Sequence, residues 1–153
     1  MKPISQSGMD ELLSELKQLR EVERPPLMQA IQAARALGDL KENAEYQTAR
    51  EKQRWMDRRI GELEKLITGS KVIDFSNATE GVASFGAVVE LEDEAGKRVS
   101  YQLLGGTESD IAAGKISVSS PIGKALVGHK VGDLVSVHTP SGVKEYEIIS
   151  VRF

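Results

Sequence analysis

"GDLKENAEY" (residues 38–46) interrupts the most regular helical pattern in this sequence. Gly38 suits the left-handed backbone conformation that closes a helix. Asp39 and Glu42 have the spacing of a capping box, in which Asp39 is the N-cap of the next helix and Glu42 its third residue. We therefore predict that this stretch is the tip of a hairpin made of two helices.

The segment before the tip is predicted to be one long helix. Ser7, followed three residues later by Asp10, is typical of a helix start. Apolar residues then repeat on one face, at Leu12, Leu16, Leu19, Leu27, Ile31, Ala34 and Leu37. Pro25 and Pro26 interrupt this face, because proline lacks a backbone N–H and crowds the preceding turn. Since the spacing resumes after them, we predict a kinked arm rather than the end of the helix.

The segment after the tip carries an apolar seam with alternating steps of three and four residues. Its members are Tyr46, Ala49, Gln53, Met56, Ile60, Leu63 and Ile67, with Gln53 as the polar exception. Such a seam is typical of an antiparallel coiled coil, and arms of about 26 to 28 residues would each reach roughly 40 Å. Tyr46 fits either coiled-coil packing or a contact with a partner, and the sequence leaves both open.

The sequence changes character near Asp74. Beyond it, short runs of alternating apolar residues are separated by turn signals, which predicts a domain of strands. We expect the strands at about residues 71–75, 87–92, 97–104, 115–119, 134–139 and 144–151. One short helix is expected after Ser120, which can cap it, with Pro121 in its first turn and Gly128 at its end. The predicted fold class is α+β, with a coiled-coil domain over residues 1–74 and a second domain over residues 75–153.

The composition excludes several kinds of function. The chain has 153 residues and no cysteine, so it can form neither a disulfide nor a thiolate metal site. It has neither an apolar run long enough to span a membrane nor a signal-peptide pattern, so we expect a cytoplasmic protein. The net charge of -3 argues against general binding to nucleic acid, so any such contact must be local. His129 and His138 have no carboxylate at metal or triad spacing, and we expect them to be surface or packing residues.

The carboxylates of the tip have two interpretations. Helix capping explains Asp39 and Glu42 fully, because this spacing is common at helix starts. Alternatively, they crowd acidic groups with Glu45 at the end of a long arm, where a cation would offset their repulsion. Carboxylate oxygens suit Mg²⁺, which is usually held by one or two protein carboxylates and by substrate phosphates. An exposed tip would bind this ion weakly alone, but it could complete a two-metal site in another protein.

Several motifs resemble the Gre family of bacterial transcript cleavage factors. The tip is followed by "TAREKQ", the arm exits through "VIDF", and the C-terminal part contains "ISVSSPIGKALVGHKVGD" and "TPSGVKEYEI". These motifs cover nearly the whole chain, and Lys41 in the tip favours the GreA type over the GreB type. The resemblance implies an N-terminal coiled coil and a C-terminal FKBP-like domain that docks on RNA polymerase. It also implies that the coiled coil enters the polymerase's secondary channel, where its acidic tip stimulates cleavage of backtracked RNA by the polymerase's own active centre.

The resemblance also implies roles for particular residues. Asp39 and Glu42 would support a Mg²⁺ ion that is shared with the polymerase and is not held stably by this chain alone. A basic patch would hold the 3′ end of the backtracked RNA, and it consists of Arg50, Lys52, Arg54 and Arg58. A solvated, salt-bridged helix face explains the same basic run, and this alternative stays open. The segment that would touch the polymerase is Ser119, Ser120 and Pro121.

The predicted function is that of an accessory factor rather than an enzyme. It would act as a monomer on RNA polymerase and would take no small-molecule substrate. Trp55, beside the basic run, is expected to pack against an arginine stem or the C-terminal domain rather than to stack on a base. Two other functions remain as alternatives. A channel-binding regulator that does not stimulate cleavage would be expected to have an altered tip, whereas the acids here are intact. A prolyl isomerase is suggested only by the FKBP-like resemblance, and the few aromatic residues of the C-terminal half argue against it.

Overall fold

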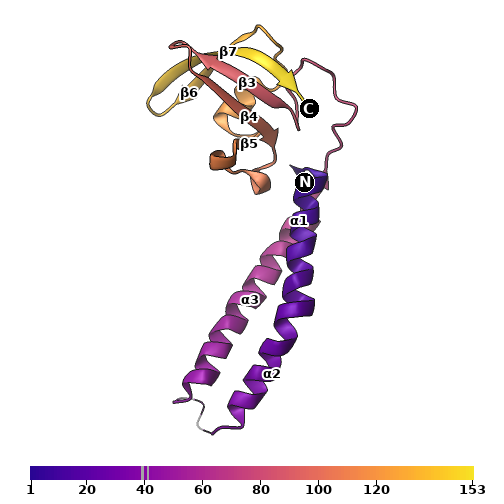
Figure 1. The fold of residues 1–153 in the computed structure, drawn as a ribbon, viewed down its shortest axis with the longest axis vertical. Helices are drawn as coiled ribbons and strands as arrows, with labels where there is room; N and C mark the ends of the chain where they lie inside the picture. The colour runs from indigo at the N-terminus through magenta and orange to yellow at the C-terminus, as the bar shows by residue number, and fades with distance from the viewer. Residues whose placement is uncertain (39, 41) are drawn as a thin grey trace. The chain divides into compact units, whose positions relative to one another are not determined.

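A computed structural model describes residues 1–38, 40 and 42–153, so that Asp39 and Lys41 lie outside the described residues. The chain forms two compact units (Figure 1). One unit is Met9–Gly69, and the other combines Met1–Gly8 with Ser70–Phe153. The sequence placed a single division near Asp74, whereas in the structure the first eight residues belong to the same unit as the C-terminal part.

The first arm of the hairpin is helical along its whole length (Figure 1). It consists of α1 (Gln6–Lys17), a π-helical segment η1 (Gln18–Glu23) and α2 (Arg24–Arg35). The N–H of Arg24 bonds to the carbonyl of Leu19, five residues back, just before Pro25 and Pro26. The wider π turn lets the arm continue where two residues cannot donate a backbone hydrogen bond. The prediction that the prolines do not end the arm is therefore confirmed.

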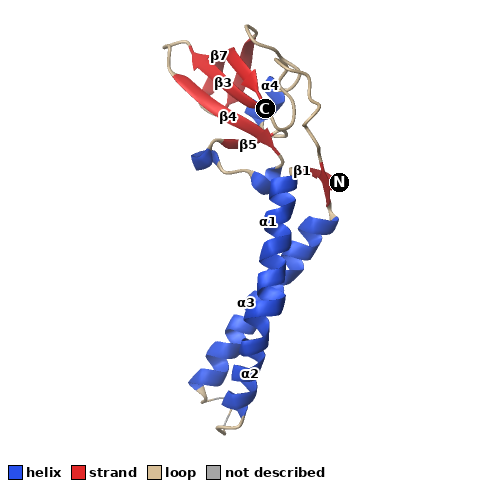
Figure 2. Ribbon diagram, turned by 45° about the vertical axis from the view of Figure 1, so that its right-hand side comes forward, coloured by secondary structure: helices blue, strands red, loops and turns tan. Residues whose placement is uncertain are grey.

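The second arm is α3 (Ala44–Thr68), which runs antiparallel to the first (Figures 1 and 2). It buries Gln53, Met56 and Leu63 from the predicted seam. The facing arm buries Leu12, Leu19, Leu27, Ile31 and Ala34. The amide of Gln53 donates to Met28 Sδ at 3.3 Å, so the polar seam residue has a partner across the hairpin. The predicted helical hairpin is confirmed.

Ion pairs join the two arms along their exposed edges. Arg59 donates to both carboxylate oxygens of Glu15, at 2.7 and 2.9 Å, and Arg24 pairs with Asp57 at 3.3 Å. The hydrogen bonds from Arg59 lower the pKa of Glu15, so this stabilisation is present at neutral pH and is lost as the pH falls through the lowered pKa. Both side chains are partly solvated, so we expect a contribution below about 1 kcal/mol.

The C-terminal unit is built on a sheet within residues 70–153, all of which the structure describes. The strand order is β5-β4-β3-β7-β6, with bounds Lys115–Ser117, Arg98–Leu104, Val88–Asp93, Gly142–Arg152 and Leu134–Thr139. Neighbouring strands are antiparallel except for β4 and β5. The core gathers around Val89, Leu91, Leu103, Leu126 and Ile148, each with no exposed surface. Figure 2 shows this sheet, and the predicted α+β class is confirmed.

The short helix α4 (Pro121–Leu126) agrees with its sequence signals. The N–H of Gly123 donates to Ser120 Oγ at 3.1 Å, and Gly128 follows the helix with a φ of 88°. Two short 3-10 segments, η2 (Gly106–Glu108) and η3 (Ile111–Ala113), were not predicted. One histidine expectation needs correction, because His129 Nδ1 lies 3.2 Å from Asp133 Oδ2. The N–H of Lys130 and the imidazole of His129 lower the pKa of Asp133.

An N-terminal strand, β1 (Lys2–Ile4), pairs in parallel with β2 (Ser70–Val72). The sequence did not reveal β1, because three residues that include a proline give no alternating pattern. Ile4 is fully buried. Among the described residues, no helix is long and apolar enough to cross a membrane.

The start of α1 also differs from its prediction. The N–H of Gly8 donates to Ser5 Oγ at 3.0 Å, so Ser5 makes the N-cap contact that was expected of Ser7. The carboxylate of Glu108 in turn accepts from the N–H of Ser5 at 3.0 Å, from the Ser5 hydroxyl and from the N–H of Gly105 at 3.3 Å. Ser5 is the true cap because its hydroxyl is fixed by a residue that is distant in sequence. We call these contacts the Glu108 clasp.

Candidate functional site

The tip of the hairpin is closed by Asn43. Its Oδ1 accepts from the N–H of Tyr46 at 3.0 Å, which makes Asn43 the N-cap of α3. Its Nδ2 donates to the carbonyl of Ala34, at the end of α2, at 2.7 Å. The predicted capping box is therefore wrong: α3 begins at Ala44, four residues later than the box requires, and Asp39 itself lies outside the described residues. One asparagine side chain thus satisfies a free donor of α3 and adds a second hydrogen bond to the Ala34 carbonyl, which also accepts from the N–H of Leu37 at 3.1 Å.

Further contacts from both helices fix the tip. Gln47 Nε2 donates to the carbonyl of Leu40 at 2.7 Å, and the guanidinium of Arg35 lies over the ring of Tyr46 at 5.8 Å from its centroid. Gly38 has a φ of 120°, a backbone conformation that favours glycine. The sequence left Tyr46 open between packing and partner contact, and in the free protein its ring faces a cation of the other arm.

Glu42 is exposed in the turn directly before Asn43. The Glu42 carboxylate is open to solvent, and the backbone around it is held in place by the hydrogen bonds of Asn43 and Gln47. Among the described residues, no three histidine, cysteine, aspartate or glutamate side chains gather as a metal site. The described part of the tip thus offers Glu42 as a hard oxygen ligand rather than a complete metal cage.

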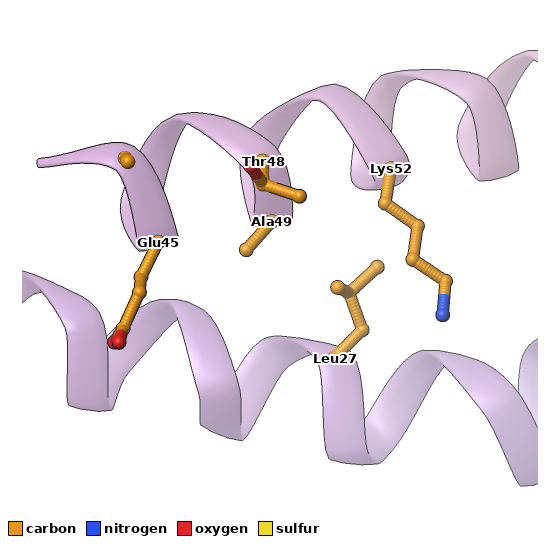
Figure 3. Close-up of a pocket in the computed structure, with 6 residues that line it drawn as sticks. Leu27, Glu45, Thr48, Ala49 and Lys52 are labelled. Carbon is orange, nitrogen blue, oxygen red and sulfur yellow. The ribbon is translucent and has the colours of Figure 1, made fainter.

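Glu45 and Lys52 line a hollow between α2 and α3 (Figure 3). Its volume is about 450 Å³, and its other lining residues are Leu27, Ala44, Thr48 and Ala49. Figure 3 shows both charged side chains reaching from α3 toward α2, with Leu27 between them. Successive residues of an α-helix turn by about 100°. Lys52 is two residues from both Arg50 and Arg54, so it lies about 200° around α3 from each of them. The structure does not bring it together with those arginines.

The remaining members of the predicted basic patch differ in their partners. Arg50 is hydrogen-bonded to Gln53 Oε1, whereas Arg54 and Arg58 are exposed. Two acids close to this run in the sequence pair with other cations, because Asp57 contacts Arg24 and Glu62 contacts Arg59. Within the part of the chain that the structure describes, Arg54 and Arg58 have no acidic partner. Their charges are thus available to an outside anion.

The predicted polymerase-binding segment joins β5 to α4. Ser119 and Pro121 are exposed, and Ser119 Oγ lies 2.7 Å from Ser117 Oγ. The hydroxyl of Ser120 donates to the carbonyl of Ser117 at 2.6 Å and caps α4, so its hydrogen-bonding capacity is used internally. Ser119 and Pro121 are therefore the members of this segment that are exposed to solvent.

Comparison with known proteins identifies the family. Residues 2–72 match the model of the transcription elongation factor N-terminal domain, and residues 78–153 match that of the GreA/GreB C-terminal domain. The chain belongs to the GreA/GreB family of transcription elongation factors. It is 49% identical to the transcription elongation factor GreA of Acidiphilium cryptum, over 99% of this chain and 97% of that protein. It is 48% identical to GreA of Alkalilimnicola ehrlichii, with the same coverage.

A solved structure also aligns with this GreA/GreB family member. The GreA factor homolog 1 of Thermus thermophilus is 28% identical over 99% of this chain and 98% of that chain, with a TM-score of 0.44. The family membership rests on the sequence matches, and the resemblance noted in the sequence is confirmed.

Replacing Asn43 by alanine in this family member should loosen the tip. The variant loses the N-cap contact and the hydrogen bond that joins α3 to the Ala34 carbonyl, at a local cost of about 1 to 2 kcal/mol. We expect faster amide hydrogen exchange at Tyr46 and Gln47, by about tenfold. Asn43→Asp keeps the cap acceptor and should show a smaller change. Equal exchange in the parent and Asn43→Ala would mean that Asn43 does not hold the tip.

Proposed function

We propose that this chain binds bacterial RNA polymerase and stimulates the polymerase's own Mg²⁺-dependent cleavage of backtracked RNA. The observation that carries the proposal is the exposed Glu42, held in a tip that Asn43 ties to both helices. A long hairpin can carry this carboxylate into a narrow channel while its C-terminal unit remains outside. The family membership supports the same function, because its relatives are named transcription elongation factors.

The tip contributes charge and position rather than a complete catalytic site. Glu42 would hold a Mg²⁺ ion or orient a water molecule in the polymerase active centre, and Asp39 would be the second acid. When bound, Mg²⁺ supplies Lewis-acid stabilisation of the reacting phosphate. A solvated carboxylate with a fixed backbone fits this ion, which is commonly held by one or two protein carboxylates. The chain would act as an accessory factor and would bind the ion weakly when alone.

Other surfaces would hold the partners. Arg54 and Arg58 would attract the phosphates of the extruded RNA 3′ end, with Arg50 adding charge beside them and Lys52 adding charge on another side of α3. Ser119 and Pro121, next to the capping Ser120, would contact the polymerase. We place this activity in the bacterial cytoplasm and assign it to the monomer.

The prolyl isomerase alternative has no structural feature in its favour among the described residues. A hollow of about 550 Å³ in the C-terminal unit is lined by Phe75 and Phe153, but Glu80 and Arg152 also line it. Proline pockets are expected to be mainly apolar, so this lining is too highly charged for one.

The proposal is tested with stalled, backtracked complexes of bacterial RNA polymerase that carry labelled RNA. Adding the full chain should shorten the RNA from its 3′ end and restore extension, at a rate that depends on Mg²⁺. Binding to the polymerase without shortening of the RNA would favour the non-cleaving regulator instead. Shortening by the chain without polymerase would contradict its role as an accessory factor.

A further inference from the structure

Trp55 is the single tryptophan of the chain, and its side chain is unusually exposed for that residue type. It lies on α3 between the buried seam residues Gln53 and Met56, yet 51% of its surface is open to solvent. Among the described residues, its ring has neither an aromatic partner nor a hydrogen bond. It was expected to pack, and an indole that leaves half of its surface open to solvent commonly marks a binding surface.

Two cations flank Trp55 at helical spacing. Lys52 precedes Trp55 by three residues and Arg58 follows it by three. One cation therefore lies a helical turn before the ring and the other a turn after it. Each is separated from Trp55 by about 4.5 Å along the helix axis. Both are exposed, and neither has an acidic partner in the part of the chain that the structure describes. The indole is therefore bracketed by two available positive charges.

The other neighbours of the ring do not cancel this charge. Arg59, four residues after Trp55, is engaged by Glu15 and Glu62. Glu51, four residues before it, is exposed and is the one free acid among these neighbours. Arg54 adds a further unpaired cation next to the ring. The surface around Trp55 thus carries a net positive charge and a flat, apolar face.

We propose that Trp55 is a stacking platform for a base of single-stranded RNA, with Lys52 and Arg58 contacting the phosphates on either side of that nucleotide. Cationic grooves with exposed aromatic rings bind single strands in this way, because every base has a π face and every linkage a charge. The inference rests on the proposed function, which brings extruded RNA to this arm. It adds base stacking to an RNA-binding surface whose other proposed contacts are between positive side chains and phosphates.

The charge pattern favours RNA over a protein partner. An indole that anchored a protein contact would be expected to have an apolar surround and few free cations at its core. Here the cations one helical turn from the ring are Lys52 and Arg58, which would have to be desolvated against a protein but would remain useful against phosphates.

The single tryptophan makes the test direct. The intrinsic fluorescence of the full chain is followed during titration with a short single-stranded RNA and with an abasic strand of the same length and charge. Anisotropy of the labelled strands measures binding independently. We expect the RNA to quench Trp55 and the abasic strand to bind without quenching. Affinity for both strands should fall with salt between about 50 and 200 mM.

Variants separate stacking from charge. Trp55→Leu should weaken RNA binding about tenfold and leave binding of the abasic strand unchanged, whereas Trp55→Phe should stay within about threefold of the parent. Circular dichroism checks that the hairpin remains folded.

The inference is overturned if RNA does not bind, if bound RNA leaves the fluorescence unchanged, or if Trp55→Leu binds RNA as well as the parent. Quenching by polymerase without RNA, and not by RNA, would assign Trp55 to a protein contact. These results do not depend on Glu42, so they are distinguishable from failure of the cleavage function.

Discussion

Replacing Glu42 by glutamine is expected to reduce stimulated RNA cleavage about 100-fold while leaving polymerase binding nearly unchanged. Glutamine has almost the same shape as glutamate but lacks the negative charge that makes a carboxylate a strong ligand for Mg²⁺. Charge stabilisation by a bound metal ion is worth several kcal/mol, and about 2.7 kcal/mol corresponds to 100-fold in rate. Because Glu42 lies outside α3 and the described residues show no cap made by its side chain, the substitution should leave the tip intact. The measurement is the single-turnover rate of RNA shortening in backtracked complexes at saturating factor.

Glu11→Gln is the matched control, because it removes the same charge from an exposed position of the same hairpin, in α1. It should retain cleavage within about twofold. Asp39→Asn, at the acid outside the described residues, tests the second proposed ligand in the same assay. Unchanged cleavage by Glu42→Gln would show that the tip acts by shape rather than by charge, and the proposed role of Glu42 would then be abandoned.

Glu108→Ala is expected to destabilise the C-terminal unit by about 3 kcal/mol. The substitution removes the acceptor for the N–H of Ser5, for its hydroxyl and for the N–H of Gly105. Ser5 and Gly105 are buried, and each buried donor left without a partner costs about 1 to 3 kcal/mol. Because the Glu108 clasp holds β1, the N-terminal strand should separate from β2 before the sheet unfolds. Urea unfolding and amide exchange of Ile4 and Ser5 measure the two effects.

Glu94→Ala provides the comparison for this prediction, since Glu94 is exposed in the turn between β3 and β4. Its effect should stay within about 0.5 kcal/mol. Glu108→Gln keeps one acceptor oxygen and should fall between the two alanine variants. If Glu108→Ala and Glu94→Ala were equally stable, the clasp would contribute nothing to the unit.

Sequence patterns predicted the elements whose signals are local. The seam of α3 repeats over many turns, so one exception at Gln53 does not obscure it. The signals of α4 are adjacent in the chain, with Ser120, Pro121 and Gly128 at the positions that capping requires. The strands of the C-terminal sheet were located to within a few residues for the same reason.

Features that depend on distant contacts could not be predicted. Asp39 and Asn43 are both good N-cap residues, and the choice between them depends on the contact of Asn43 with Ala34 on the other arm. Ser5 rather than Ser7 caps α1 because Glu108, 103 residues away in sequence, fixes its hydroxyl. The basic run looked uniform, but the nearby acids Asp57 and Glu62 pair with Arg24 and Arg59, and Arg54 and Arg58 have no acidic partner among the described residues. Asn43 could have been considered from its residue type alone, whereas Glu108 gave no local signal.

The π-helical segment before the two prolines bears on how this arm tolerates changes in length. Leu19 and Leu27 are both buried although eight residues separate them, and in a uniform α-helix that separation would rotate Leu27 by about 80° from Leu19. A π turn rotates the chain less per residue than an α-helical turn does, so it offsets this rotation of about 80°. The segment therefore behaves like an α-helix with one inserted residue. A deletion of one exposed residue within it, such as Val22, would restore a seven-residue step from Leu19 to Leu27, but it would also remove the wider turn that accommodates Pro25 and Pro26. The same deletion within α2 would instead rotate every later seam residue away from α3. This short segment therefore lets the arm carry one residue more than a uniform α-helix would, without losing its alignment.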